Sequence, residues 1–178
     1  MRTLSNKLIV GNNNLLCLVL TCYRLRYKYK SNNKQHSCNA YMDPAKTIAG
    51  LCRQTGLTLD EVNLFCYYCS RLLTPQDKRS YERKRLRLKW VDKYCFGACI
   101  ACTCLCAQSA VKELYQQRVS PTGVENLTGN PLGDIYMRCR VCLTLLSPTD
   151  KLNHLTSGEE FVQAGNQWWG TCRGCCAN

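Results

Sequence analysis

The pattern of apolar and polar positions predicts a chain of short helices and strands that begins after residue 41. The first sustained apolar pattern lies in the segment 42–65, at Ile48, Leu51, Leu57, Val62, Leu64 and Phe65. Farther along, Leu86, Leu88 and Trp90 alternate with basic residues, which is the period of a half-buried strand. Elements this short must pack together to form a core.

The second half of the chain follows the same plan. Helical spacing of the apolar residues in 107–115 predicts a linker helix, and the glycines and prolines of 121–133 predict a loop after it. The pairs Phe161-Val162 and Trp168-Trp169 lead into the last cysteines. We therefore expect an α+β fold of two small domains, each a short antiparallel sheet with helices, joined by the linker helix.

A thirteen-residue segment occurs twice. Residues 66–78 and 139–151 lie seventy-three positions apart and share seven identical residues. In both copies a hydroxyl residue, Thr74 or Ser147, precedes a proline and, two positions later, an aspartate, which predicts an N-capped helix. A fixed period indicates that one structural unit is duplicated and that each copy binds its own metal.

Four Cys-x-x-Cys pairs supply the ligands. In each copy the two pairs are separated by thirty positions, and a thiolate pair on a tight turn provides half of a tetrahedral zinc shell. With one zinc ion in each copy, the zinc domains are 66–102 and 139–178, with the linker helix and loop in 103–138. The alternative is a crossed arrangement, in which the first pair joins the third. We assign one structural zinc ion to Cys66, Cys69, Cys99 and Cys102, and a second to Cys139, Cys142, Cys172 and Cys175.

Zinc accounts for the cysteines better than three other kinds of site. Disulfides require an oxidising compartment, and the apolar run 15–21 lacks the cleavage site of a signal peptide. A redox pair needs one Cys-x-x-Cys at the head of a helix, and a catalytic thiol needs a histidine base. Because zinc binding supplies about 10 kcal/mol or more of folding free energy in small domains, we expect chelation to unfold the chain.

The same composition argues against an enzyme. The chain has only two histidines, His36 in the N-terminal arm and His154 near the end of a short helix, and neither has an identifiable catalytic partner. Four thiolates close a zinc shell and leave no position for an activated water. We expect His154 to be a surface or packing residue. Eight cysteines remain unassigned, namely Cys17, Cys22, Cys38, Cys52, Cys95, Cys104, Cys106 and Cys176.

Positive charge is concentrated at the N-terminus. The formal net charge is +12, and residues 1–41 hold seven basic residues and no acidic one. This arm is also rich in asparagine, so we expect it to be disordered, and Met42 is a candidate for the native start. No apolar run reaches the length of about twenty residues that a bilayer span requires, so we expect no membrane-spanning segment.

Two surfaces are candidates for binding a partner. The stretch from Lys78 to Lys93 carries eight basic residues with Tyr81 and Trp90 among them, a composition found in phosphate-contacting surfaces. That surface would make the chain a nucleic-acid-binding zinc-finger regulator. The other candidate is the cleft expected between the two domains, which would grip a helix. There Arg138 would either pair with a carboxylate of the bound helix or form a salt bridge within the fold.

Several motifs together resemble one protein family. They are the doubled Cys-x-x-Cys units, the thirty-seven positions between Cys102 and Cys139, Met137-Arg-Cys-Arg-Val-Cys142, Gly129-Asn-Pro-Leu132, and the ending Trp168-Trp-Gly-Thr-Cys-Arg-Gly-Cys-Cys176. In these motifs, residues 42–178 closely resemble papillomavirus early protein 6, a viral oncoprotein with two four-cysteine zinc-binding repeats. The arm 1–41 has no counterpart in the usual family pattern.

The resemblance implies an adaptor without enzymatic activity. Members of the family bind an acidic helix containing Leu-x-x-Leu-Leu between the two zinc domains and the linker helix, and some redirect a host HECT ubiquitin ligase against tumour suppressors or apoptosis factors. Others bind transcriptional coactivators of Notch signalling or focal-adhesion adaptors. The resemblance further implies a place in the host nucleus and host cytoplasm, effects on apoptosis, innate immunity and proliferation, weak self-association as a homodimer, and non-specific contact with DNA.

By position, the groove-lining residues of that family fall on Tyr68, Leu86, Arg138 and Trp168. Two departures from the family pattern bear on partner choice. Gln167 stands where some members carry an arginine, which removes a cation that would pair with an acidic ligand. The ending after Cys176, Ala-Asn, lacks the hydroxyl and the aliphatic residue of PDZ-binding tails, so we expect no PDZ-domain binding.

Overall fold

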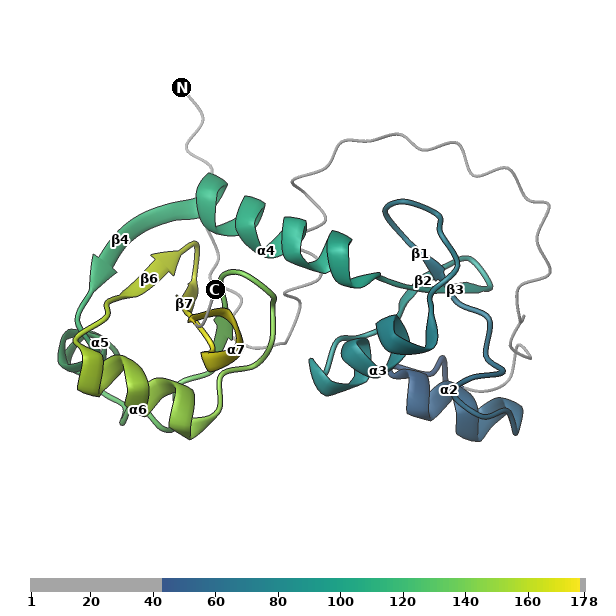
Figure 1. Cartoon of the computed structure of the whole chain (residues 1–178), viewed down its shortest axis with the longest axis horizontal. Coiled ribbons are helices and arrows are strands. Elements are labelled where there is room, and N and C mark those ends of the chain that lie inside the picture. Colours follow the sequence, from purple (N-terminus) through teal and green to yellow (C-terminus); the bar gives the residue numbers. More distant parts are fainter. Residues whose placement is uncertain (1–42, 177–178) are drawn as a thin grey trace, which may run out of the picture.

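A computed structural model describes residues 43–176. The basic arm 1–41, the candidate start at Met42 and the last two residues of the tail lie outside the described part of the chain. Figure 1 shows two units of helices and strands, with the long helix α4 (Ile100–Leu114) running from one to the other. Among residues 43–176, no helix combines the length and the apolar composition that a membrane crossing requires.

The first unit is a three-stranded sheet with two helices. Its elements are α2 (Ile48–Thr55), β1 (Phe65–Cys66), α3 (Pro75–Arg83), β2 (Lys89–Val91) and β3 (Tyr94–Gly97). The strand order is β1-β3-β2. Leu86 and Leu88 are buried as the alternation predicts, but the strand begins only at Lys89.

The second unit is a four-stranded sheet in the order β4-β6-β7-β5. Its elements are β4 (Tyr115–Val119), α5 (Pro121–Thr128), β5 (Met137–Cys139), α6 (Pro148–Ser157), β6 (Phe161–Ala164), β7 (Gln167–Gly170) and α7 (Arg173–Cys176). The stretch 103–138, interpreted from the sequence as a linker helix and a loop, therefore holds most of α4 together with β4, α5 and the start of β5.

The α+β class is confirmed, and each sheet departs from a purely antiparallel pattern in one pairing. In both units the strand that ends at the first cysteine is parallel to the strand that leads into the second pair, with Phe65 opposite Phe96 and Met137 opposite Trp168. The carboxyl ends of parallel strands meet at one edge of a sheet. This pairing therefore places the two cysteine pairs of each unit at the same end.

Both predicted helix caps form complete capping boxes. In α3 the Asp77 N–H donates to Thr74 Oγ1 at 3.1 Å, and the Thr74 N–H donates to Asp77 Oδ2 at 3.0 Å. Ser147 and Asp150 make the equivalent bonds at 3.1 and 2.9 Å. Each box satisfies backbone donors that the first helical turn leaves unpaired. Helix α6 continues to Ser157, so His154 lies in its last turn.

A buried lysine on the capped helix of each unit hydrogen-bonds to the backbone of the segment that precedes the first cysteine pair. The Nζ of Lys78 donates to two backbone carbonyls, eighteen and sixteen positions before it, both at 3.0 Å. The Nζ of Lys151 donates to carbonyls at the same two separations, at 2.8 and 2.6 Å. The segment before each first cysteine pair is therefore a structural part of its unit.

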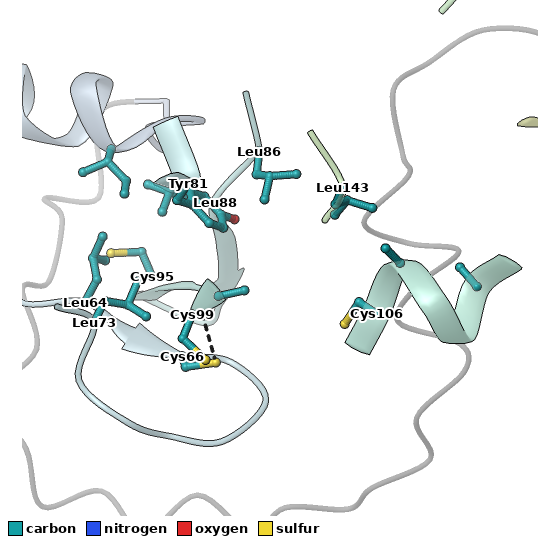
Figure 2. Close-up of a cluster of buried hydrophobic side chains, with 14 of the residues drawn as sticks. Leu64, Cys66, Leu73, Tyr81, Leu86, Leu88, Cys95, Cys99, Cys106 and Leu143 are labelled. Atoms are coloured by element: carbon teal, nitrogen blue, oxygen red, sulfur yellow. Dashed lines mark hydrogen bonds between the residues drawn. The ribbon is translucent and has the colours of Figure 1, made fainter. Parts of the chain in front are cut away.

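One apolar core runs through both units. Figure 2 shows Leu143, from the second unit, near Leu86 of the first unit and Cys106 of α4. A smaller core includes Val124 and Phe161 and lies on the other face of the second sheet. Helix α4 is therefore shared by both units and is not a bare connector. The larger core takes buried side chains from the first unit, α4 and the second sheet, including Leu64, Leu86, Ala107, Ala110, Leu143, Val162 and Trp169.

Candidate metal centres

The eight cysteines of the four pairs form two groups of four. In each group the four Sγ atoms lie within 4.8 Å of one another. Each group lies within one copy of the repeat, so the crossed arrangement is wrong. The first group is Cys66, Cys69, Cys99 and Cys102, and the second is Cys139, Cys142, Cys172 and Cys175.

The sulfur positions fit a tetrahedral zinc ion. With Zn–S bonds of about 2.3 Å, the edges of such a tetrahedron are about 3.8 Å long. The Sγ atoms of Cys69 and Cys99 are 3.8 Å apart, and those of Cys142 and Cys172 are 3.7 Å apart. Both edges join a ligand of the first pair to a ligand of the second pair. Each group can therefore close around one ion.

Each first pair lies on a tight turn at the end of a strand. The N–H of Ser70 donates to the Cys66 carbonyl, and the N–H of Leu143 donates to the Cys139 carbonyl, both at 2.9 Å. Ser70 and Leu143 have φ angles of 57° and 68°, in the left-handed region. The turn thus brings the second cysteine of the pair back beside the first.

Each second pair lies at the start of a helix. Cys99 is the N-cap of α4, and the N–H of Cys102 donates to its Sγ at 3.5 Å. Cys172 directly precedes α7. The free N–H groups at the start of α4 favour negative charge, so this position stabilises a thiolate.

Backbone N–H groups also tie the two pairs of each group together. The N–H of Cys99 donates to the Sγ of Cys66, and the N–H of Cys172 donates to the Sγ of Cys139, both at 3.4 Å. Figure 2 marks the first of these bonds. The same bond in both units indicates that the backbone supports ligand charge in the same way at both sites.

Without a metal, Cys66, Cys99 and Cys102 of the first group differ in how readily they ionise. Burial raises the pKa of Cys66, and burial together with the hydrogen bond to Cys99 raises the pKa of Cys102. Burial also opposes ionisation of Cys99, but hydrogen bonds from the Cys102 N–H and from Arg71 lower its pKa to about 7. The thiolate of Cys99 thus forms more readily than those of Cys66 and Cys102.

The thiols of the second group also differ in pKa. A hydrogen bond from the Cys139 thiol lowers the pKa of Cys142 to about 4, while that contact and burial raise the pKa of Cys139. Burial and the hydrogen bond to Cys142 raise the pKa of Cys175 to about 12. A bound divalent cation removes this difference in ionisation, since every thiol that coordinates it is deprotonated. Four thiolates then close the shell, which makes the ion structural.

A repeated aspartate connects the capped helix to the second cysteine pair. Asp77 Oδ1 accepts from the N–H of Ile100, and Asp150 Oδ1 accepts from the N–H of Arg173, both at 2.9 Å. Each donor directly follows the third ligand of its site. From the sequence, only the capping role of these aspartates is predicted, although their identity in both repeats is a signal that they do more.

His154 is a packing residue, as expected. It is fully buried and stacks on Phe161, with ring centroids 4.3 Å apart. The N–H of Thr171 donates to Nε2 at 2.9 Å, so the ring proton is on Nδ1, which donates to the Glu159 carbonyl at 3.0 Å. Nε2 therefore joins α6 to the segment that leads into Cys172, and Nδ1 joins α6 to the residues just before β6.

Three of the residues implied as a partner groove differ in their surroundings. Leu86 is buried in the larger core. Tyr68 is half-buried against the same core, and its pKa is raised by burial and by a hydrogen bond with Cys106 of α4. Trp168 is half-buried on β7 and packs against the smaller core, beside the half-buried Gln167. The larger core thus brings Tyr68 and Leu86 together, and Trp168 faces the other side of the second sheet.

The fourth of these residues, Arg138, joins the two units. Its Nη1 donates to the carbonyls of Lys84 and Leu143, both at 2.8 Å, and its guanidinium lies 5.3 Å from the centre of the Tyr136 ring. Burial lowers the pKa of Arg138, which is only 5% exposed. Among residues 43–176 no carboxylate forms an ion pair with Arg138, so the salt bridge considered above is absent. We call this contact region, formed by Leu86, Arg138, Leu143 and α4, the seam.

The basic stretch from Lys78 to Lys93 is only partly exposed. Lys78 and Lys84 are 3% and 6% exposed, so two of its cations do not face solvent. Arg79 is exposed and lies 3.4 Å from Asp60. A phosphate-contacting surface would therefore depend on the exposed cations that remain, Arg83, Arg85, Arg87 and Lys93.

Five of the unassigned cysteines are described, and none of the five joins a metal group. They are Cys52, Cys95, Cys104, Cys106 and Cys176. Cys95 and Cys106 are buried in the larger core, where a cysteine outside any metal group behaves as a small apolar side chain. The other three unassigned cysteines, Cys17, Cys22 and Cys38, lie outside the described residues.

Comparisons with known proteins agree with this arrangement. A family model described as Early Protein (E6) matches residues 66–175. Protein E6 of Human papillomavirus type 60 is 33% identical over 129 residues, which span 72% of this chain and 91% of that protein. Protein E6 of Mastomys natalensis papillomavirus, isolate African multimammate rat, is 33% identical over 134 residues, which span 73% of this chain and 96% of that protein.

One similar solved structure is the solution structure of the C-terminal zinc-binding domain of HPV51 oncoprotein E6. It has a TM-score of 0.33 and 28% identity, and the match covers 34% of this chain and 80% of that one. The cofactor prediction rests on the sulfur geometry and the family match, which together confirm two structural zinc ions per chain.

Proposed function

The chain belongs to the papillomavirus E6 family, and on this premise we propose that it is a viral early adaptor without enzymatic activity of its own. It binds an acidic host helix containing Leu-x-x-Leu-Leu at the seam between its two zinc-binding units. The helix belongs to a HECT ubiquitin ligase, which the adaptor redirects, or to a Notch coactivator, which it blocks. In the host nucleus and cytoplasm, that partner determines its effects on apoptosis, innate immunity and proliferation.

The observation that carries this proposal is that the guanidinium of Arg138 is buried with incomplete hydrogen bonding. A buried guanidinium is costly unless it is paired with an anion and fully hydrogen-bonded. Two carbonyls compensate part of this cost, but the Nε of Arg138 is buried without a hydrogen-bond partner. A carboxylate on a bound helix would supply both the missing charge and the missing acceptor.

A second unpaired donor supports the same location. Trp169 lies opposite Arg138 in the parallel pairing of β5 with β7, and its Nε1 is also buried without a partner. Residues opposite one another in a parallel pair point to the same face of the sheet. That face belongs to the larger core, where Leu86 and Leu143 would contact the leucines of the helix.

Binding would replace an existing contact. The bond from Arg138 to the Lys84 carbonyl runs from the second unit to the first, so a helix that takes up the guanidinium must compete with it. The proposal therefore includes a small movement of the units at the seam. The zinc sites, which lie within the units, keep each unit intact during that movement.

The test is a binding titration of the zinc-loaded full chain with a fluorescent acidic peptide containing Leu-x-x-Leu-Leu. Arg138→Gln removes the charge and keeps hydrogen-bonding capacity. We expect it to weaken binding about tenfold or more, since loss of one partner of a buried charge pair costs about 2 kcal/mol or more. Arg118→Gln, an exposed arginine on β4, is the matched control and should bind as the unchanged chain does.

Zinc content should remain two per chain in both variants, which separates a binding defect from unfolding. Equal affinity of Arg138→Gln and Arg118→Gln for the peptide would contradict the proposal. So would equal binding of a peptide whose motif leucines are replaced by alanine.

Charge reversal at Arg83, Arg85 and Arg87 tests the nucleic-acid alternative. Under the adaptor proposal it leaves peptide binding unchanged, whereas a DNA-binding protein would lose a strongly salt-dependent affinity.

A further inference from the structure

The two zinc sites differ in the residue that follows the first cysteine pair. Two positions after that pair, the first unit carries Arg71 and the second unit carries Thr144. These positions are equivalent in the repeat, and both lie on the turn that presents the first two ligands. A difference in charge at this place is therefore a difference between the sites themselves.

Arg71 contacts a zinc ligand and a carboxylate at once. Its Nη2 lies 3.0 Å from Asp77 Oδ2, and the interaction of its side chain with the sulfur of Cys99 raises the pKa of Arg71. Asp77 in turn accepts from the N–H of Ile100, the residue after Cys99, at 2.9 Å. Arg71, Asp77 and the backbone beside the third ligand thus form one connected set of contacts around Cys99.

The second unit has a different arrangement. The Sγ of Cys142 lies 3.2 Å from Thr144 Oγ1, so the partner in the second unit is an uncharged hydroxyl, and the ligand that it contacts is a different one. The cation near its repeated aspartate is Arg173, whose Nε lies 3.8 Å from Asp150 Oδ1. Arg173 stands at the position equivalent to Ile100, after the third ligand, and it lies near Oδ1 of its aspartate, whereas Arg71 lies near Oδ2.

The charge of the metal site makes this contact important. A zinc ion with four thiolates carries a net charge of about −2, and a partly buried site must offset that charge. A guanidinium that donates to a ligand sulfur offsets part of it. The same guanidinium, fixed by Asp77, also restricts the direction of the sulfur.

We propose that Arg71 is a positioning residue of the first zinc site, which holds Cys99 in the geometry that binds zinc, and that the second site has no equivalent. This inference concerns metal binding and does not depend on the adaptor proposal. The simpler explanation is an ordinary surface ion pair with Asp77, because the Arg71 side chain is 48% exposed and exposed pairs contribute little. Only the positioning role predicts an effect on zinc affinity.

The test measures the zinc affinity of both sites in the full chain. The zinc-loaded protein is titrated with a chromogenic chelator, and the metal-free protein with Co²⁺, whose absorption bands report tetrahedral sulfur ligation. Arg71→Leu removes the cation. The matched control is Arg79→Leu, since Arg79 is also exposed and forms an ion pair with Asp60 in the same unit, at 3.4 Å.

We expect Arg71→Leu to weaken one of the two sites about tenfold or more and to leave the other unchanged, as substitutions next to metal ligands do. Arg79→Leu should change neither site. Equal affinities in the two variants would overturn the proposal. Equal weakening of both sites in Arg71→Leu would overturn it as well, because that result indicates an effect on the whole fold.

Two further variants separate charge from geometry. Arg71→Lys keeps the charge but loses the planar fork of the guanidinium, so we expect an intermediate affinity. Full restoration by lysine would show that charge alone suffices and that the positioning role is wrong. Asp77→Asn should add little to the effect of Arg71→Leu, because both act through the same contacts. If the effects of Arg71→Leu and Asp77→Asn on zinc affinity were strictly additive, the two residues would not act through one connected set of contacts.

Discussion

Two glycines occupy the same position in the repeat, two residues before the third ligand of each site. A Cβ built on Gly97 would lie 2.8 Å from Leu73 Cδ1, and one built on Gly170 would lie 2.8 Å from Leu146 Cδ1. Neither glycine has a positive φ, so space, and not backbone conformation, excludes a larger residue. The strand must pass this close to its own core for the second cysteine pair to reach the first.

Gly170→Ala should destabilise the second unit by about 1–3 kcal/mol, the usual cost of overpacking. A Cβ there would also lie 2.8 Å from Phe161 Cε1 and 2.9 Å from His154 Nε2, and these two rings are stacked and fully buried. Gly97→Ala should cost less, because the closest obstacle is a single leucine methyl. Urea unfolding of the zinc-loaded variants measures both effects. Gly174→Ala, with no atom within 4 Å, is the control, and an equal loss in all three variants would contradict the argument.

At the scale of elements, capping chemistry decides where the repeated helices begin. Helices α3 and α6 both follow a hydroxyl N-cap and begin at a proline. Both capping boxes are closed by an aspartate whose second oxygen accepts from the backbone beside a zinc ligand. One carboxylate thus starts a helix and fixes a metal-binding turn. The capping box and the zinc site are therefore energetically connected.

Ser147→Ala should destabilise the second unit by about 1 kcal/mol, because the N–H of Asp150 loses its acceptor and the box opens. Thr149→Ala, an exposed position in the first turn of the same helix, should be neutral or slightly stabilising. Thermal unfolding of the zinc-loaded proteins measures the difference. Indistinguishable unfolding of the two variants would show that the box contributes nothing.

The sequence predicts most elements because their signals are local. The caps at Thr74 and Ser147, the linker helix and the strands near Trp169 all depend on residues within one turn or one strand. The parallel pairing of Phe65 with Phe96 depends instead on a path of thirty residues, which no local period encodes. The strand at Lys89 starts late because Leu86 and Leu88 pack into the core before the chain pairs with β3.

At the scale of the whole molecule, the zinc sites and the larger core divide the stabilisation between them. Each zinc site holds one unit together, whereas the core with Leu86, Leu143 and Trp169 crosses from one unit to the other. Loss of one ion should therefore unfold its own unit first. It should also remove part of the apolar cover of the other unit.

Cys142→Ala should lower the zinc content from two ions per chain to one. We expect the second unit to unfold and the first unit to melt at a lower temperature, because Leu143, Val162 and Trp169 leave the shared core. Elemental analysis and thermal denaturation measure the two effects. Cys176→Ala, at an exposed cysteine outside the groups, is the control and should retain both ions. A zinc content of two in Cys142→Ala would refute the assignment.

The ligand sets are predictable from spacing because a four-thiolate shell leaves few ways to combine four pairs. The groove residues are harder to place. From the sequence, Arg138 is a candidate for a salt bridge within the fold, but its guanidinium donates to two carbonyls, and Lys84, which supplies one of them, is fifty-four positions away. Contacts of that separation depend on how the units pack at the seam, and no pattern in a single sequence reports such packing.

Helix α4 determines how the chain can be dissected. Ala107 and Ala110 belong to a core that includes the first unit, and the face of the second sheet that carries Val162 and Trp169 belongs to the same core. A fragment that starts after Leu114 would expose that face of the sheet to water. A fragment that ends at Leu114 would expose Ala107 and Ala110 on α4. Large uncovered apolar patches favour aggregation. Either half of the molecule, prepared alone, should therefore be less soluble than the intact chain, however well its own zinc ion is bound.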